Sequence, residues 1–132
     1  MKKVLFLFTA LLLLIACDKE DLIFNDSKIE VCVYDDQGNK MPDVRVKMYD
    51  EEQYELFKQN NLTAPTGSEI TSDTGIATFH LSHDEWFAAK NQRFLTFLVQ
   101  EGGGESNYKI WSTGKTIDAG KDAQLDIILL HR

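Results

Sequence analysis

Beyond the N-terminal segment, apolar and polar residues alternate along much of the chain, which is the pattern of half-buried β-strands. Ile29, Val31 and Val33 alternate with more polar neighbours, and a run at 44–49 repeats the alternation after a polar stretch at 35–40. Because successive side chains of a strand point to opposite faces, each run predicts a strand with one buried face. The stretch between them is rich in Asp, Asn and Gly, which predicts a turn that joins the two strands as a hairpin.

The segment 51–60 breaks this alternation and predicts a short helix inserted between strands. It is rich in helix formers, with acidic residues first and Lys58 late, as the helix dipole prefers. Tyr54 and Phe57 are three positions apart, so they share one helix face. We expect that face to dock on the sheet.

The rest of the chain continues with short apolar runs separated by turn residues. Ser82 to Glu85 fits a capping box before a helical turn that holds Trp86 and Phe87. Further strands are expected at 69–72, 76–81, 93–100, 108–113 and 124–130. Many short strands with turns between them predict an all-β fold, a single antiparallel β-sandwich of about seven strands with a short inserted helix.

The first residues have the composition of a cleavable signal peptide. Lys2 and Lys3 precede the twelve-residue run Val4–Ile15, which is apolar except for Thr9. A helix needs about 20 apolar residues to span a bilayer, so this run is too short to be a transmembrane anchor. We therefore assign residues 1–16 as a signal peptide, outside the folded domain.

The sequence Leu14-Ile15-Ala16-Cys17 resembles the lipobox of bacterial lipoprotein precursors. The resemblance implies cleavage before Cys17 and fatty acyl chains, such as palmitate, on its sulfur and new amine. Residues 18–21, Asp-Lys-Glu-Asp, resemble the surface-export signal of Bacteroidota lipoproteins. We expect a lipidated tether at 17–27 and a folded domain at 28–132. We also expect attachment to the cell outer membrane, and the sequence does not distinguish its outer face from its periplasmic face. An ordinary secreted protein is the alternative.

Charge and cysteine content exclude several classes of partner. Loss of residues 1–16 removes two of the 14 basic residues and leaves 12 against 21 acidic ones, a net charge of −9. Such a surface repels nucleic acid, so we expect no nucleic-acid partner. If Cys17 carries lipid, Cys32 has no partner within the chain, and a small buried thiol is its expected role. One cysteine and three scattered histidines do not have zinc-ligand spacing.

Two segments resemble the signatures of carboxypeptidase regulatory-like domains. The first is Val31–Gly38 followed by Met41–Val46, and the second is Thr71–Phe79. The resemblance implies a prealbumin-like (transthyretin-like) sandwich, with Gly38 and Gly75 in tight turns and Phe79 between the sheets. Such domains serve mainly as scaffolds and binding modules, so no activity follows. The helical insertion departs from the family pattern and leaves the strand order open.

Motifs that could carry catalysis or a metal have plainer explanations. Asp73-Thr74-Gly75 is the triplet of aspartic proteases, but those enzymes need two such aspartates and this triplet occurs once, where a turn is expected. A transthyretin-like hydrolase of 5-hydroxyisourate ends in Tyr-Arg-Gly-Ser, whereas this chain ends in Leu-Leu-His-Arg. Asp35, Asp36 and Asn39 could bind calcium, yet these residue types also favour turns. We expect neither an enzyme nor a cofactor.

Aromatic residues are the remaining candidates for function. Exposed aromatic clusters stack on sugars or form protein interfaces, but core or edge packing is the simpler explanation of these aromatic residues. The candidate binding surface comprises Trp86, Phe87, Trp111, Tyr54 and Phe57. We expect a non-catalytic binding or structural module of the cell envelope that engages an envelope protein or a glycan. The alternatives are a small envelope hydrolase and a subunit of a surface filament, which would need an exposed sheet edge.

Overall fold

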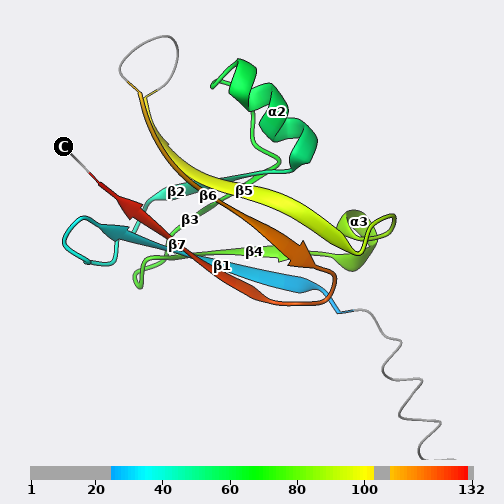
Figure 1. Cartoon of the computed structure of the whole chain (residues 1–132). Coiled ribbons are helices and arrows are strands. Elements are labelled where there is room, and N and C mark those ends of the chain that lie inside the picture. Colours follow the sequence, from blue (N-terminus) through cyan, green and yellow to red (C-terminus); the bar gives the residue numbers. More distant parts are fainter. Residues whose placement is uncertain (1–24, 103–107, 131–132) are drawn as a thin grey trace, which may run out of the picture.

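The computed structural model describes residues 25–102 and 108–130, which form seven strands and two short helices (Figure 1). In these ranges, no helix is both long and apolar enough to cross a bilayer. The elements in chain order are β1 (Ser27–Asp35), β2 (Arg45–Tyr49), α2 (Glu51–Gln59), β3 (Gly67–Ile70), β4 (Ile76–Leu81), α3 (His83–Trp86), β5 (Gln92–Glu101), β6 (Lys109–Asp118) and β7 (Ala123–Leu129).

The strands form two sheets that pack face to face, which confirms the predicted β-sandwich. One sheet has the order β4-β1-β7 and the other has the order β3-β2-β5-β6, so the strand order around the inserted helix is now defined. Four of the five strand pairs are antiparallel. The exception is β1 with β7, which run parallel from Ile29 opposite Ala123 to Asp35 opposite Leu129. The sandwich is therefore not antiparallel throughout.

The predicted hairpin between the first two strands is wrong. β1 pairs with β4 and β7, whereas β2 pairs with β3 and β5, so the two strands belong to opposite sheets. After a single bridge between Tyr34 and Lys40, the chain crosses from one layer to the other. Asp43 lies in this crossing with a φ of 59°, a left-handed conformation that Asp tolerates better than most residues. Alternation had specified which faces are buried, but not which strands pair.

The hydrophobic core lies between the two sheets and follows the alternation of the strands. Ile29, Val31 and Val33 of β1 are fully buried. Phe79 of β4 meets Phe97 of β5 across the interface, with ring centroids 5.3 Å apart in an edge-to-face arrangement. Phe79 therefore lies between the sheets, as expected. Burial of a side chain of this size contributes about 1.5–3 kcal/mol, so the core supplies most of the stability.

Helix α2 forms as predicted and covers part of the outer face of the four-stranded sheet (Figure 1). Its N-cap is Asp50, whose carboxylate accepts a hydrogen bond of 2.8 Å from the backbone N–H of Gln53. Phe57 is buried against Tyr49 and Leu98, and the Tyr49 and Phe57 ring centroids are 4.8 Å apart. This small second core attaches the helix to the sheet.

The two signature glycines occupy tight turns, as the family resemblance implied. Gly38 and Gly75 have φ values of 84° and 75°, a region that L side chains rarely adopt. A Cβ at Gly75 would lie 3.1 Å from both the Val33 carbonyl oxygen and the Met41 nitrogen. The backbone N–H of Gly75 donates to the Ser72 carbonyl at 2.9 Å, so the Asp73-Thr74-Gly75 triplet is a turn.

Helix α3 begins where the sequence predicted, but without the expected capping box. Ser82 is the N-cap residue, yet its side chain makes no capping hydrogen bond, and its hydroxyl oxygen is buried with no partner among the described residues. Backbone hydrogen bonds close the turn instead, from Trp86 to Ser82 and from Phe87 to His83. Burial of Phe87 in the main core therefore anchors this helix.

Candidate functional site at the helix α3 end of the sandwich

The described chain begins at the end of the sandwich that carries helix α3, and several hydrogen bonds fix it there (Figure 1). The Asp26 carboxylate accepts a hydrogen bond of 3.3 Å from the backbone N–H of His83. The Ser27 hydroxyl donates to the Asp118 carbonyl at 3.3 Å, and the Lys28 N–H donates to the Asp122 carboxylate at 3.0 Å. The entry of the chain is thus bonded to both α3 and the β6–β7 turn.

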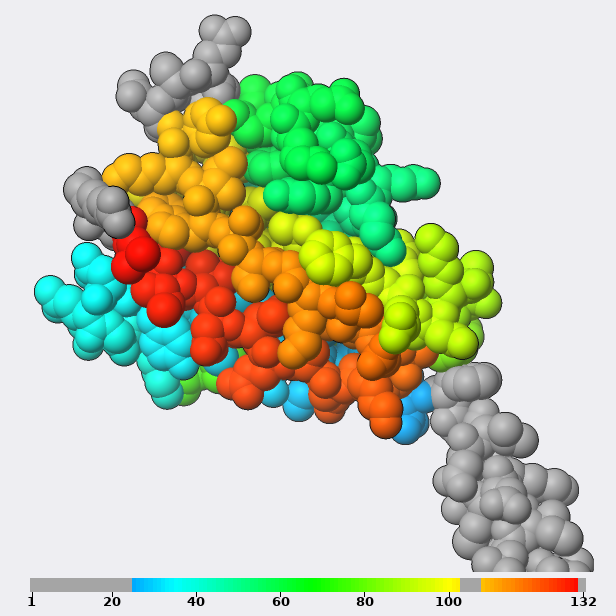
Figure 2. Space-filling view, viewed as in Figure 1, coloured from blue at the N-terminus to red at the C-terminus, as the bar shows by residue number. Residues whose placement is uncertain are grey.

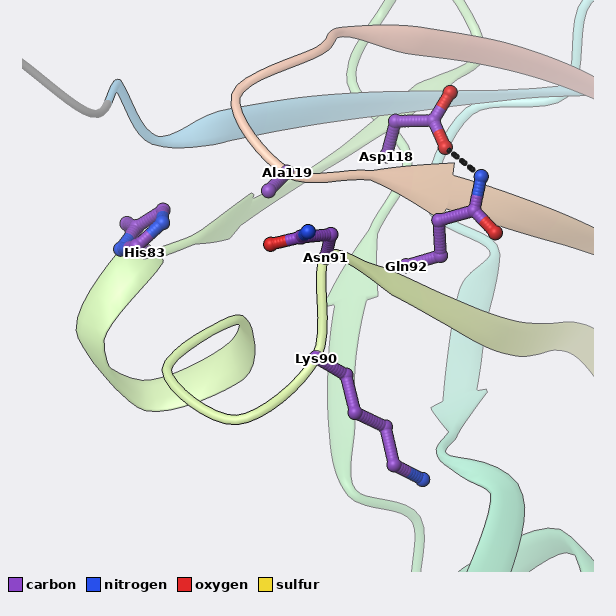
Figure 3. Close-up of a pocket in the computed structure, with 6 residues that line it drawn as sticks. All are labelled: His83, Lys90, Asn91, Gln92, Asp118 and Ala119. Carbon is purple, nitrogen blue, oxygen red and sulfur yellow. Dashed lines mark hydrogen bonds between the residues drawn. The ribbon is translucent and has the colours of Figure 1, made fainter. Parts of the chain in front are cut away.

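A depression of about 810 Å³ lies at this end of the molecule (Figure 3). In the space-filling view the segment around α3 and the end of β6 adjoin here, next to the start of the described chain (Figure 2). The depression is open to solvent and is lined by residues of three separate segments. They are His83, Lys90, Asn91, Gln92, Asp118 and Ala119.

Strand pairing brings these distant residues together. Gln92 and Asp118 are register partners at the end of the β5–β6 ladder, and the Gln92 carboxamide donates to the Asp118 carboxylate at 2.7 Å. Beyond the ladder, the Ala119 N–H donates to the Asn91 carbonyl at 2.8 Å. The His83 side chain, only 16% exposed, comes from α3, and the Asn91 side chain points toward it (Figure 3).

A second, smaller depression of about 340 Å³ lies beside the start of α2. Its lining combines an indole ring, a hydroxyl, two carboxylates and a guanidinium, from Asp50, Thr66, Glu85, Trp86 and Arg93. The predicted binding surface included residues of the 51–60 helix and Trp86. The start of that helix and Trp86 meet at this depression. The structure therefore joins two candidate surfaces that lie about thirty residues apart in sequence.

Arg93 is the residue that joins them. Its guanidinium donates three hydrogen bonds of 2.9–3.1 Å to the Glu51 carboxylate and a fourth, of 2.9 Å, to the Trp86 carbonyl. It also lies over the Trp86 indole, 5.3 Å from the ring centroid. The hydrogen bonds from Arg93 lower the pKa of the Glu51 carboxyl below its ordinary value, and the reciprocal bonds raise the pKa of Arg93. This cluster holds α2, β5 and the end of α3 in one arrangement.

The five aromatic residues of the predicted binding surface do not form one exposed cluster. Phe57 and Phe87 are buried, at 6% and 2% exposure, so both pack rather than face solvent. Trp86 is partly buried beside Arg93, and Tyr54 packs on the small core under α2. Trp111 lies apart on β6, where its indole N–H donates to the Leu130 carbonyl at 3.2 Å. Trp86 and Phe87 lie at the α3 end, and of these two only Trp86 is partly exposed.

Two other sequence expectations concern cysteine. Cys17 lies outside the described residues. Cys32 is buried, as expected, and among the described residues it is a free thiol. It alternates out of phase with the core residues of β1, so it lies on the outer face of the three-stranded sheet, where Gln124 donates to its sulfur at 3.4 Å.

The calcium alternative at residues 35–39 receives no support from the loop geometry. The Asp35 carboxylate accepts hydrogen bonds from the backbone of Gln37 and Asn39 and from the Asn39 carboxamide, at 2.8–3.1 Å. These bonds, chiefly those from Asn39, lower the pKa of Asp35. The carboxylate therefore orders its own turn. Within residues 25–102 and 108–130, no three His, Cys, Asp or Glu side chains are grouped to hold a metal ion.

The polar residues of the larger depression were not recognised from the sequence. Lys90, Asn91 and Gln92 precede the strand expected at 93–100, and Asp118 lies between the strands expected at 108–113 and 124–130. The one available signal was Gly120, a turn residue that marks the end of β6. Because β5 and β6 are antiparallel, the end of β6 lies beside the start of β5. The pairing register itself could not be read from the alternation.

The fold and this end of the molecule define a small two-sheet β-sandwich domain with polar depressions around helix α3. No protein-family model matches the chain, and no curated protein matches it significantly.

Proposed function

We propose that this protein is a Bacteroidota-type lipoprotein, attached to the outer membrane through lipid on Cys17. Its carboxypeptidase regulatory-like sandwich is a non-catalytic binding or structural module that engages an envelope protein or a glycan. The lipobox supports the anchor, because it supplies the thiol that carries the acyl chains. Two or three such chains hold a domain far more firmly than one, at about 0.8 kcal/mol for each buried methylene.

The observation that carries the proposal is that the segment just before β1 is fixed at the α3 end of the sandwich. Asn25 lies beside Gly120 of the β6–β7 turn, and the next residue, Asp26, is hydrogen-bonded to the start of α3; Asn25 follows Cys17 by eight positions. Eight residue steps span at most about 28 Å even when fully extended. An anchor on Cys17 would therefore keep the α3 end, with its two depressions, near the bilayer surface, where membrane-bound partners and envelope glycans are found.

The contact between the two signature turns supports the family assignment. The backbone N–H of Val33 donates to the Gly75 carbonyl at 2.8 Å, and the N–H of Met41 donates to the Val33 carbonyl at 2.9 Å. The two sequence signatures thus form one hydrogen-bonded unit at the end of the sandwich away from α3. Gly75 lies within this unit, with a φ of 75° that L side chains rarely adopt.

The charged groups at the α3 end support recognition as the role of this surface. Gln92 holds the Asp118 carboxylate, and Arg93 holds that of Glu51. Side chains fixed in this way lose little further freedom when a partner binds, which favours affinity.

Metabolic labelling with a palmitate analogue tests the anchor. The wild-type protein and a Cys32→Ala variant should both take up the label, because Cys32 is buried within the fold. A Cys17→Ala variant should take up none. A Cys17→Ala variant that still carries label would refute the anchor. Protease shaving of whole cells then distinguishes the outer face from the periplasmic face.

The filament alternative depends on a free sheet edge. β6 has ten residues and lies at the edge of the four-stranded sheet. Its exposed side chains include Lys109 and Lys115, and lysines on an edge strand oppose the addition of another strand. The β6 edge is therefore a poor acceptor for a donated strand.

A further inference from the structure

The larger depression at the α3 end has the chemistry of a site for a neutral, hydroxyl-rich ligand. Its lining carries one carboxylate, on Asp118, and one ammonium, on Lys90, so the two charges cancel. The carboxamides of Asn91 and Gln92 each offer both a donor and an acceptor. Because these charges offset each other, the lining gives no net attraction to an anionic or a cationic ligand.

Part of this hydrogen-bonding capacity is unused. Within the described residues, the side chains of Lys90 and Asn91 have no hydrogen-bond partner, while Gln92 and Asp118 hold one another at 2.7 Å. That bond uses one amide hydrogen of Gln92 and leaves its carbonyl oxygen and further lone pairs of Asp118 to accept from a ligand. The Asn91 carboxamide points into the depression toward His83, and Lys90 extends at its rim (Figure 3).

The size and openness of the depression also limit the ligand. Its volume of about 810 Å³ falls in the usual range of small-molecule sites, roughly 300–1,000 Å³. It opens to solvent, so a chain longer than the depression can extend out of it. Ala119 adds a small apolar surface beside the polar groups, which suits the C–H faces of a sugar ring.

We propose that the depression lined by His83, Asn91, Gln92 and Asp118 binds a neutral saccharide unit at the end of a glycan chain. This deepens the proposed function and rests on it only for the setting of the envelope. The Asn91 carboxamide and the Gln92–Asp118 pair hydrogen-bond to ring hydroxyls, and Ala119 contacts the sugar ring. Charge balance between Lys90 and Asp118 selects neutral sugars over acidic or amino sugars.

The test is a titration of the ¹⁵N-labelled protein, purified in detergent, with maltose, cellobiose and N,N′-diacetylchitobiose. Glucuronic acid and glucosamine serve as charged comparisons. At least one neutral disaccharide should shift the amide signals of residues 83, 91, 92 and 119, and neither charged sugar should bind as tightly. The absence of shifts at these residues with all three disaccharides would overturn the proposal, as would tighter binding of a charged sugar.

Two variants sharpen the result. Asn91→Ala removes a side chain with no partner in the fold and should weaken disaccharide binding about tenfold, whereas the matched removal of an exposed carboxamide on α2, Gln59→Ala, should leave it unchanged. Equal weakening by both variants would count against the site. Asp118→Asn leaves Lys90 unbalanced and should improve glucuronic acid binding several-fold, and an unchanged preference would contradict the charge argument.

The sugar titration and the lipid label fail independently. Loss of the saccharide shifts with a retained palmitate label would refute this site alone. Saccharide shifts in a protein without a label would refute the anchor and leave the site in place.

Discussion

The interaction between Arg93 and Glu51 predicts a measurable coupling between helix α2 and the α3 loop. The pair is bidentate, and the two side chains are 20% and 35% exposed, so solvent screens it only in part. We expect a coupling energy of about 1 kcal/mol, at the upper end for exposed pairs and well below the 3–5 kcal/mol that follows the breaking of a buried pair. The bond to the Trp86 carbonyl adds about 1 kcal/mol and the indole contact about 0.5 kcal/mol.

A double-mutant cycle measures this coupling directly. Arg93→Met should lower the free energy of unfolding by about 2–3 kcal/mol, as the sum of these contributions, and Glu51→Gln by about 1 kcal/mol. Urea unfolding of both single variants and the double variant, followed by tryptophan fluorescence, gives the coupling term. The matched control is Lys90→Met, an exposed cation with no partner among the described residues, which should stay within about 0.5 kcal/mol of wild type.

The pH dependence of the same cycle provides a second readout. The pKa of Glu51 is lower in the folded state than its ordinary value of 4.5, chiefly through the hydrogen bonds from Arg93. Its contribution is therefore fully present above pH about 4.5 and is lost as the pH falls through the folded pKa. Glu51→Gln should show a flatter loss of stability below pH about 4.5 than wild type. A coupling below about 0.3 kcal/mol, or identical acid profiles, would refute this account of the pair.

Three further substitutions test the fold. Phe57→Ala should lower the free energy of unfolding by about 3 kcal/mol in urea, because Phe57 is 6% exposed under α2, whereas Leu56→Ala, at 51% exposure, should cost little; similar costs would contradict the docking of this helix. Gly75→Ala should lower the melting temperature, because φ is 75° and the added Cβ would meet Val33 and Met41 backbone atoms at 3.1 Å; an unchanged melting temperature would argue against this turn. Asp35→Asn should lower stability near neutral pH, because the pKa of Asp35 is lowered in the folded state. The difference from wild type should stay full down to pH about 3.8 and shrink only as the pH falls further, through the folded pKa; a constant difference at every pH would contradict the role of the carboxylate.

The layers of the fold could be predicted from the sequence because burial leaves a local pattern. The alternation at Ile29, Val31 and Val33 marks a strand wherever that strand pairs, and the acidic start and late Lys58 mark α2. Gly38 and Gly75 mark turns because only glycine adopts their φ at little cost. These signals depend on neighbours within a few residues.

Pairing between distant strands leaves no such local pattern. β1 pairs in parallel with β7, about ninety residues later, and an alternating strand can pair equally well on either side and in either direction. The predicted hairpin failed for this reason, because residues 35–44 carry turn chemistry whether the next strand stays in the same sheet or crosses to the other.

The candidate site was predicted only in part. The Trp86 loop and α2 were nominated separately, and their connection through Arg93 depends on a salt bridge between residues 42 positions apart. The β5–β6 register brings residues 91–92 beside residues 118–119. Lys90, Asn91 and Asp118 line one depression only because of this pairing. The predicted binding surface was chosen by its aromatic residues, and two of these, Phe57 and Phe87, are buried. Large apolar rings are usually buried, so they are poor markers of a binding surface.

Mass spectrometry of the N-terminal peptide of the native protein is the most direct test of the central claim, that acyl chains on Cys17 hold this sandwich at the outer membrane. We predict a mature chain that begins at Cys17 and carries a diacylglyceryl group on its sulfur. An N-terminus without lipid, or one that begins at another residue, would contradict it.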